Sequence, residues 1–567
     1  MHLSQLQSLI LDRNRLSSLP AQLGQCTSLT FLSIVENEIE GIPVPASIHA
    51  LTNLIALDLS ENDISVLPDE VCSLLKLEAL YLDDNRISSI PLSEMGSCTA
   101  LLEIVADNNL IKEIPREFSC LTSLTLLGIG FNNIVTIPSQ IGMMTAMKSL
   151  ILQKNEIIYF PSSISWLMQL ETLNMSGNAV SVFPKSVCKV GNLYSLDFSR
   201  NDMEKLVPYI GNLLGMKEMV LSFNKIDEIP AQIGKLVHLT TLKLDFNRLT
   251  FLHAAIGALT SLTCLDVSHN QIEELPSEFF DLTNLQQLAL NHNKLIYLSG
   301  AVSSYQRLAE LYVSHNYLRA LPDAISSLKK LINMLFLDDC NLNQIPDAIG
   351  YCISLRCLSA GGNTITLVPA AISGLTSLEI LNLSMNKICF FPEVYNLTNM
   401  VQLNLNDNLI ANIKMTIGDM VRLEELYIGN NKLSTVPSTV GCLLSLHSLE
   451  LQRNRILSLP ESIGALTLLR SLKLHGNLLS SLPSSVSRLI HLEVLTLRDN
   501  QISEPPSAIL SLSSLKTLTL GKNKLDKMPD KQVQRLKSSG MEEEDDENTR
   551  APRRDGMRDT RVFHSSD

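Results

Sequence analysis

The chain has 567 residues, of which 45% are hydrophobic and only 5% aromatic, a composition typical of one long aliphatic core. Its formal net charge of -13 argues against a nucleic acid or an anionic membrane surface as partner. No stretch approaches about 18 uninterrupted apolar residues, so the sequence predicts no membrane span.

The cysteines and the N-terminal residues bear on the cellular compartment in which the protein is located. Eleven cysteines are scattered singly, with no CxxC pair, which favours free thiols in a reducing environment. The N-terminal residues "MHLSQLQSLILDRN" lack the basic segment and apolar run of a secretory signal. Three N-x-S/T triplets, at Asn174, Asn382 and Asn396, point the other way, but such triplets arise by chance in a sequence rich in these residues. We therefore predict a cytoplasmic protein.

A motif of the form LxxLxLxxNxL repeats from the first residues almost to the C-terminus. Its asparagine position, called the slot here, recurs from Asn14 to Asn523 at steps that are nearly all 23 residues long. We number the 23 resulting coils by their slots. Cys340 occupies the slot of coil 15, and Pro346 follows it by six residues, as Pro20 follows Asn14.

Each part of the motif predicts a local structure. The alternation in "LxLxx" indicates a short strand with one buried face. A buried asparagine amide can donate to and accept from the backbone of neighbouring coils, which predicts a ladder along the stack, and a thiol can replace it with weaker bonds. The proline fixes φ and starts an outer segment, "PxxIGxLxxLxxL", whose spacing suits a short helix or turn. Coils that lack this proline, at Val207, His253, Ser299 and Lys414, are expected to be looser there.

Two segments carry a family resemblance: "LPESIGALTLLRSLKLHGNLLSSLP" (459–483) and "IPAQIGKLVHLTTLKLDFNRL" (229–249). They resemble the 23-residue leucine-rich repeat of the Ras-group proteins, such as the Shoc scaffold and the plant intracellular Ras-group proteins. The resemblance implies an α/β solenoid, a right-handed horseshoe with a parallel inner β-sheet and about 23 repeats. It also implies a protein partner, either a Ras-type small GTPase or a phosphatase or kinase complex.

The C-terminal residues differ in composition from the repeats. After Pro529 the sequence ends in "MEEEDDENTRAPRRDGMRDTRVFHSSD", an acidic run followed by arginines, with few apolar residues. We predict a leucine-rich repeat domain over residues 1–530, and a short C-terminal extension with a disordered charged tail over 531–567.

Catalytic and metal-binding motifs are missing from the sequence. It has no GxGxxG after a strand, no GxxxxGK[ST], no HExxH and no GxSxG. His269, His292 and His315 recur 23 residues apart in outward positions, so they should form a row about 4.8 Å apart, which cannot converge on one zinc ion. A Ser-His-Asp group from Asp266, Ser268 and His269 fails because adjacent strand residues point to opposite faces. We predict no enzyme activity, no metal and no cofactor.

The outward residues of successive strands should form a continuous concave surface with three zones. The middle zone combines aromatic residues, which are enriched at interface centres, with histidines and carboxylates, and we predict that it binds the partner. We expect the Tyr312 and Phe336 rings to stack, with Asp338 and Asp339 beside His315 to pair with a basic side chain of the partner. The acidic zone contains Asp58, Glu61, Asp83, Asp84, Glu103 and Asp107; the middle zone contains Phe223, Phe246, His269, His292, Tyr312, His315, Phe336, Asp338 and Asp339; the basic zone contains Arg453, Lys473, His475, Arg498 and Lys522.

Two functions fit this sequence. The first is a non-catalytic scaffold that binds a protein on its concave face, in Ras-type GTPase signalling if the resemblance extends to function. The second is a ligand-binding leucine-rich repeat fragment of a larger receptor or kinase.

Overall fold

The computed structural model describes residues 5–41, 44–90, 97–328, 332–394 and 396–525. The predicted C-terminal tail and its boundary at residue 530 lie outside the described residues. The chain divides into two compact units, Met1–Lys387 and Ile388–Asp567. The boundary falls where the slot spacing shortens to 22 residues, between Asn386 and Asn408.

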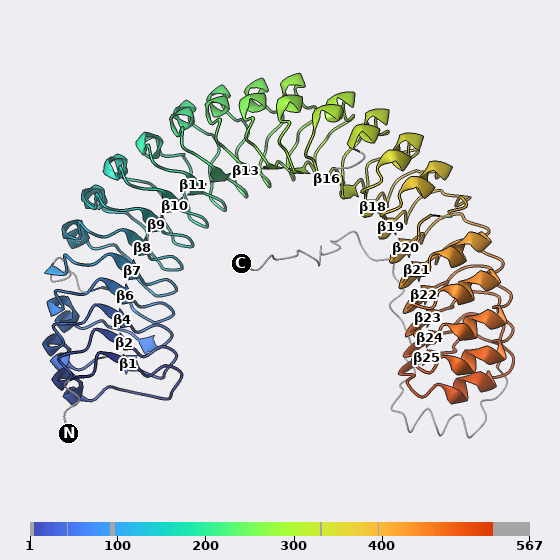
Figure 1. The fold of residues 1–567 in the computed structure, drawn as a ribbon, viewed down its shortest axis with the longest axis horizontal. Helices are drawn as coiled ribbons and strands as arrows, with labels where there is room; N and C mark the ends of the chain where they lie inside the picture. Colours follow the sequence, from blue (N-terminus) through green and yellow to red (C-terminus); the bar gives the residue numbers. More distant parts are fainter. Residues whose placement is uncertain (1–4, 42–43, 91–96, 329–331, 395, 526–567) are drawn as a thin grey trace. The chain divides into compact units, whose positions relative to one another are not determined.

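In the first unit, each coil contributes one three-residue strand to a parallel sheet, and each strand pairs in register with the strand of the next coil. The strands line the inner side of the coils (Figure 1). They are β1 (Ser8–Ile10), β2 (Phe31–Ser33), β4 (Ala56–Asp58), β6 (Ala79–Tyr81), β7 (Glu103–Val105), β8 (Leu126–Gly128), β9 (Ser149–Ile151), β10 (Thr172–Asn174), β11 (Ser195–Asp197), β12 (Glu218–Val220), β13 (Thr241–Lys243), β14 (Cys264–Asp266), β15 (Gln287–Ala289), β16 (Glu310–Tyr312), β17 (Met334–Phe336), β18 (Cys357–Ser359) and β19 (Ile380–Asn382). A separate small sheet pairs β3 (Glu40–Gly41) with β5 (Asp63–Ile64).

Short 3-10 helices form the outer side of the same unit, as the apolar spacing of the outer segment predicts. They are η1 (Ala21–Gln25), η2 (Ala46–Ala50), η3 (Asp69–Ser73), η5 (Arg116–Cys120), η6 (Ser139–Met143), η7 (Ser162–Trp166), η8 (Val187–Lys189), η9 (Pro208–Asn212), η10 (Ala231–Lys235), η11 (Ala254–Ala258), η12 (Ser277–Asp281), η13 (Gly300–Ser304), η14 (Asp323–Leu328), η15 (Asp347–Tyr351) and η16 (Ala370–Gly374).

The second unit repeats this pattern with a parallel run of strands and outer 3-10 helices. Together the units confirm the predicted α/β leucine-rich repeat solenoid with a parallel inner sheet. The elements of the second unit are β20 (Gln402–Asn404), η17 (Met415–Asp419), β21 (Glu425–Tyr427), η18 (Ser438–Cys442), β22 (Ser448–Glu450), η19 (Glu461–Ala465), β23 (Ser471–Lys473), η20 (Ser484–Arg488), β24 (Val494–Thr496), η21 (Ser507–Ser511) and β25 (Thr517–Thr519).

The core lies between the strands and the 3-10 helices and consists of the consensus aliphatic residues. In coil 12, Leu262, Leu265, Val267 and Ile272 are all fully buried. Burial of each such side chain contributes about 1.5–3 kcal/mol, whereas each ordered residue costs about 1–2 kcal/mol of backbone entropy. A single 23-residue coil therefore cannot fold alone, and stability comes from stacking.

The slot asparagines form the predicted ladder. The Nδ2 group of Asn293 donates to the carbonyl oxygens of Val267 (3.0 Å), Leu290 (3.0 Å) and Asn291 (3.2 Å). Its Oδ1 accepts from the backbone N–H of Ile272 at 3.0 Å. Two of these bonds cross to the preceding coil, one in each direction, so each amide both closes its own turn and fixes the register of its neighbour.

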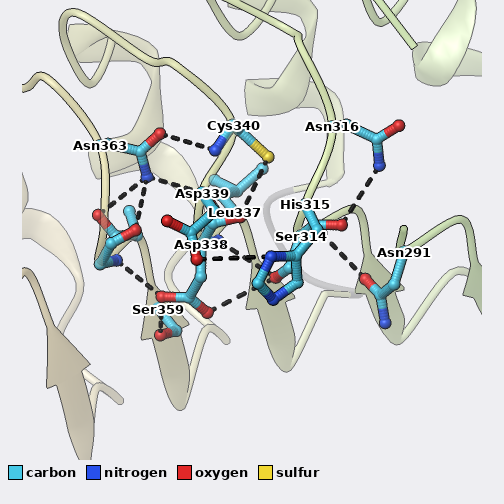
Figure 2. Close-up of polar contacts among 12 residues, drawn as sticks. Asn291, Ser314, His315, Asn316, Leu337, Asp338, Asp339, Cys340, Ser359 and Asn363 are labelled. Atoms are coloured by element: carbon cyan, nitrogen blue, oxygen red, sulfur yellow. Dashed lines mark hydrogen bonds and ion pairs between the residues drawn. The ribbon is translucent and has the colours of Figure 1, made fainter. Parts of the chain in front are cut away.

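Cys340 occupies the same slot, as predicted, and its side chain donates two hydrogen bonds where the Asn293 amide donates three. Its Sγ donates to the carbonyl oxygens of Val313 at 3.2 Å and Asp338 at 3.5 Å, and its backbone N–H donates to Asn363 Oδ1 (Figure 2). A thiol is only a weak acceptor, so the Cys340 side chain joins the preceding coil through a donated bond, whereas the backbone carbonyl of Cys340 accepts from the N–H of Arg319 at 3.2 Å.

The residue before the slot has a left-handed backbone, which the sequence analysis missed. Its φ is 51° at His269, 52° at His292 and 57° at His315, and the same conformation recurs in coils of both units. The predicted outward strand position of the histidines is therefore wrong: they lie in the turn that follows the strand. Non-glycine residues seldom adopt positive φ, and here the ladder on either side holds the conformation.

The four coils without the outer proline keep their 3-10 helices. His253 and Ser299 stand where other coils have the proline, and their side chains cap the helix that follows. His253 Nδ1 accepts from the N–H of Ala255 at 3.0 Å, and Ser299 Oγ accepts from the N–H of Ala301 at 3.2 Å. The helices that follow have the usual five residues, so the missing proline does not shorten them.

Replacing one ladder asparagine should destabilise the first unit. Asn293→Ala leaves one buried N–H and the carbonyls of two coils without their partner, at a cost of roughly 2 to 4 kcal/mol in unfolding free energy. Denaturant unfolding followed by circular dichroism measures this change. Gln271→Ala, at an exposed position, is the control, and equal stability of the two variants would contradict the ladder's role.

Burial should protect several thiols from reagents. Burial raises the pKa of Cys188 and of Cys340 to about 12 and that of Cys352 to about 11. A brief iodoacetamide pulse at pH 8 should alkylate exposed Cys120 and Cys442 but modify the three buried thiols only after unfolding. Mass spectrometry of the digested protein locates the modified residues, and fast modification of Cys340 in the folded chain would contradict this packing.

Candidate functional site

Five side chains from consecutive coils stack into what we call the aromatic column: Phe223, Phe246, His269, His292 and His315. The ring centroids are 4.2, 3.8, 4.0 and 4.0 Å apart along the series, and successive planes differ by 17° or less. All five precede a slot and have positive φ, so every coil presents its ring at the same place. The stack follows from the strict 23-residue step between coils 10 and 14.

Opposite charges lie at the two ends of the aromatic column. At one end, the guanidinium Cζ of Arg200 lies 4.2 Å from the centroid of the Phe223 ring, within cation–π distance. At the other end, Asp339 Oδ2 lies 3.4 Å from His315 Nδ1 (Figure 2). Asp339 was among the residues predicted from the sequence, whereas Arg200 was not, although Arg200 occupies the equivalent position one coil before Phe223.

The environment of the stack favours the neutral form of His269 and His292. Burial lowers the pKa of His269, and burial together with the neighbouring His269 and His315 lowers the pKa of His292 to about 4. Two charged imidazoles at about 4 Å would repel each other, whereas neutral rings can pack face to face. These rings can therefore stack face to face at neutral pH.

The stack does not suit metal binding or catalysis. Nitrogens of face-to-face imidazoles lie in parallel planes about 4 Å apart and cannot all reach one ion at about 2.1 Å. Within the described ranges, no group of three or more His, Cys, Asp or Glu is placed to hold a metal. Ser268 is buried and its hydroxyl donates to Asp266 at 2.6 Å, so it is not directed at His269 as a nucleophile would be.

A second aromatic pair lies on the strands beside the column. The rings of Tyr312 and Phe336 have centroids 5.0 Å apart and planes within 6°, which confirms the predicted stacking. The two residues are register partners on β16 and β17. The Tyr312 hydroxyl donates to Glu310 Oε2 at 2.9 Å, which orients the ring.

The two predicted carboxylates have different surroundings. Asp338 Oδ1 accepts from Ser359 Oγ and from the N–H of Gly361, both at 2.6 Å, and burial raises the pKa of this carboxyl group. Asp338 therefore ties coil 15 to coil 16. Asp339 is exposed beside His315, and a side chain at position 362 would collide with its carboxylate, so Gly362 leaves this end of the column uncovered.

The acidic zone is largely engaged in contacts between coils. Asp83 Oδ1 accepts from the N–H of Asp107 at 2.8 Å, and Asp107 Oδ1 accepts from that of Gly130 at 2.6 Å. Burial raises the pKa of Asp83 to about 6, and Glu103 accepts from the Tyr81 hydroxyl. These carboxylates therefore hold neighbouring coils together.

The basic zone lies in the second unit and is partly neutralised. Lys473 Nζ forms an ion pair with Glu450 at 2.7 Å. Burial, followed by the nearby charges of Arg453 and Lys473, lowers the pKa of His475. Of the three zones, the middle one alone combines stacked aromatic rings with charged groups at its edge.

Comparisons with known proteins identify repeats of one kind. Residues 196–311 match the model described as leucine-rich repeat region, and residues 27–87 and 76–134 match leucine rich repeat. A leucine-rich repeat protein of Leptospira interrogans is 31% identical, with a TM-score of 0.57, covering 67% of this chain and 90% of that one. None of the curated proteins matches.

Several similar solved structures are plant receptors. The plant peptide hormone receptor RGFR1, in complex with RGF2, is 26% identical with a TM-score of 0.71, covering 94% of this chain and 92% of that one. The ectodomain of the Arabidopsis receptor kinase HAESA, with a peptide hormone ligand, is 26% identical with a TM-score of 0.63, covering 92% and 87%.

These receptor structures overturn the predicted location. The cytoplasmic prediction rested on dispersed cysteines and the lack of a leader pattern, and it is contradicted by the similar solved structures, which include the receptor RGFR1 and the ectodomain of HAESA. None of the helices in the described part of the chain is long and apolar enough to cross a bilayer.

The column should make stability depend on pH. The pKa of His292 falls from its ordinary 6.5 to about 4 in the folded chain, so between these values the unfolded chain binds the extra proton and acidification favours unfolding. His292→Phe, which places a ring like Phe246 in the stack, should reduce the loss of thermal midpoint between pH 6.5 and pH 4.5. The control is His491→Gln at an exposed position, and a pH dependence equal to that of the native chain in His292→Phe would contradict this assignment.

Proposed function

The chain belongs to the leucine-rich repeat family, and we propose that it is a non-catalytic binding module that recognises a peptide or protein ligand on the inner face of its first unit. The site is the middle zone, together with Arg200. All residues predicted for the middle zone remain part of the proposed site. Asp338 contributes by joining coils 15 and 16, not by contacting the ligand.

The observation that carries this proposal is the pair of adjoining aromatic stacks. Phe223 and Phe246 are 36% and 40% exposed, on a chain that has few aromatic residues. Rings that pack on one another along the inner face create a rigid apolar surface whose side chains lose little entropy on binding. Such surfaces supply the centres of interfaces, where aromatic residues are enriched.

The receptor structures support a peptide as the kind of ligand. RGFR1 and HAESA were solved with peptide hormones, and both extend over more than nine-tenths of this chain. This favours the second function considered from the sequence, a ligand-binding leucine-rich repeat fragment of a larger receptor. A Ras-type GTPase or a phosphatase or kinase complex, implied by the Ras-group resemblance, gains no support from these structures.

Selection of peptides tests this function directly. A phage-displayed library of random 12-residue peptides is selected on the immobilised full chain, and the affinity of the enriched peptides is then measured against Tyr312→Ala combined with Phe336→Ala. Loss of a central aromatic anchor commonly costs 2 kcal/mol or more, so we expect affinity to fall about thirtyfold.

The matched control removes two exposed rings from the outer helices, Tyr209→Ala with Tyr351→Ala. This variant should bind like the native chain, and both variants should unfold at similar denaturant concentrations. Enriched peptides that bind the Tyr312 and Phe336 variant unchanged would place the ligand site elsewhere.

A further inference from the structure

The inner face of coils 9–15 is a grid with four rows. The strand register aligns the first residues of β11–β17 in one row and their third residues in a second. The two turn residues before each slot form the other two rows, and the aromatic column belongs to the last of these. We call these residues of coils 9–15 the middle grid.

The middle grid has an excess of negative charge. It contains seven carboxylates and two cationic side chains, while its three imidazoles belong to the stack. The carboxylates are Asp197, Glu218, Asp245, Asp266, Glu310, Asp338 and Asp339, and the cations are Arg200 and Lys243. A charged surface of one sign selects ligands of the opposite sign and speeds their encounter.

Four of these carboxylates retain an oxygen that can accept further bonds. Asp266 uses only Oδ1, for the N–H and hydroxyl of Ser268, and Glu310 uses only Oε2, for Tyr312. Asp197 and Glu218 likewise accept through one oxygen each, from Ser199 and Ser195 respectively. Among the described residues none of the four has a salt-bridge partner, so each can accept from a ligand.

Charged side chains gather around Cys264, on β14, near the centre of the grid. Burial is the largest effect on the pKa of this thiol and raises it; Lys243 lowers it, and Asp266, Glu310 and Glu218 each raise it by a smaller amount. Three carboxylates and one lysine therefore lie near this thiol. Arg200 lies at the edge and is stacked on Phe223. The negative field thus extends from β12 to β16, beside the Tyr312 and Phe336 rings.

We propose that the ligand is a cationic segment that lies across strands β11–β17, with lysine or arginine side chains on Glu218, Asp266 and Glu310 and an apolar side chain against Tyr312 and Phe336. This inference rests on the proposed function and specifies its ligand class. Six strand spacings of about 4.8 Å give roughly 29 Å, which eight or nine extended residues span.

Three synthetic 12-residue peptides with the same apolar residues and net charges of about +4, 0 and -4 test the ligand class. Their affinity for the full chain is measured by fluorescence polarisation at two salt concentrations. We expect the cationic peptide to bind at least about tenfold more tightly than the neutral one, and more weakly at high salt. We expect no measurable binding of the acidic peptide.

Charge-removing variants then locate the contact. Asp266→Asn with Glu310→Gln keeps the bonds to Ser268 and Tyr312 but removes two charges, and it should weaken the cationic peptide at least about tenfold. The control, Glu278→Gln with Asp281→Asn on η12, removes the same charge from the outer side and should change affinity less than about twofold. Equal weakening by both pairs would show attraction to the net charge of the chain and overturn the proposal.

Two further outcomes separate this inference from the proposed function. Tighter binding of the neutral or acidic peptide, lost in the Tyr312→Ala and Phe336→Ala variant, would refute the cationic ligand and leave the binding site in place. Failure of all three peptides to bind would also refute the ligand class. The function itself would then be decided by whether library peptides that depend on Tyr312 and Phe336 are enriched.

Discussion

The amide of each slot asparagine is the interaction on which the rest of the structure depends. It donates to carbonyls of its own coil and of the preceding coil and accepts an N–H from the latter, as Asn293 does toward Val267 and Ile272. Because the bonds run in both directions, neighbouring coils cannot slip relative to each other without breaking them. Aliphatic burial stabilises the stack, but it is non-directional, and the amides fix the register.

The fixed register converts a sequence period into a surface. A left-handed residue before each slot directs its side chain to the same place in every coil, so residues 23 positions apart become neighbours about 4 Å apart, as His269 and His292 are. Duplicated coils thereby produce a column of like rings, and single substitutions such as Arg200 and Asp339 define its ends. The binding surface we propose needs no loop insertion, since each coil contributes it from the strand and the turn.

Much of this could be predicted from the sequence because the repeat constrains it. The slot ladder, the place of Cys340 within it and the Tyr312–Phe336 stack all follow from the period and the strand alternation. The left-handed turn could not be predicted, because the residues there range from glycine to phenylalanine and carry no common signal. The caps at His253 and Ser299 could not be predicted from the proline pattern, because a histidine ring and a serine hydroxyl accept the helix N–H there. The number and spacing of the cysteines were a poor guide to the cellular location of the protein, because they bear on disulfide pairing and not directly on the compartment.

The most direct test of this account is the chemical shift of the imidazole protons in the column, measured by NMR on protein labelled at histidine. If register places His269 between the Phe246 and His292 rings, its carbon-bound ring protons lie over two aromatic faces and should be shifted upfield, and Phe246→Ala should move them back toward unstacked values. Shifts typical of a solvated histidine, unchanged in that variant, would show that the rings do not stack and that the coils do not share the register described here.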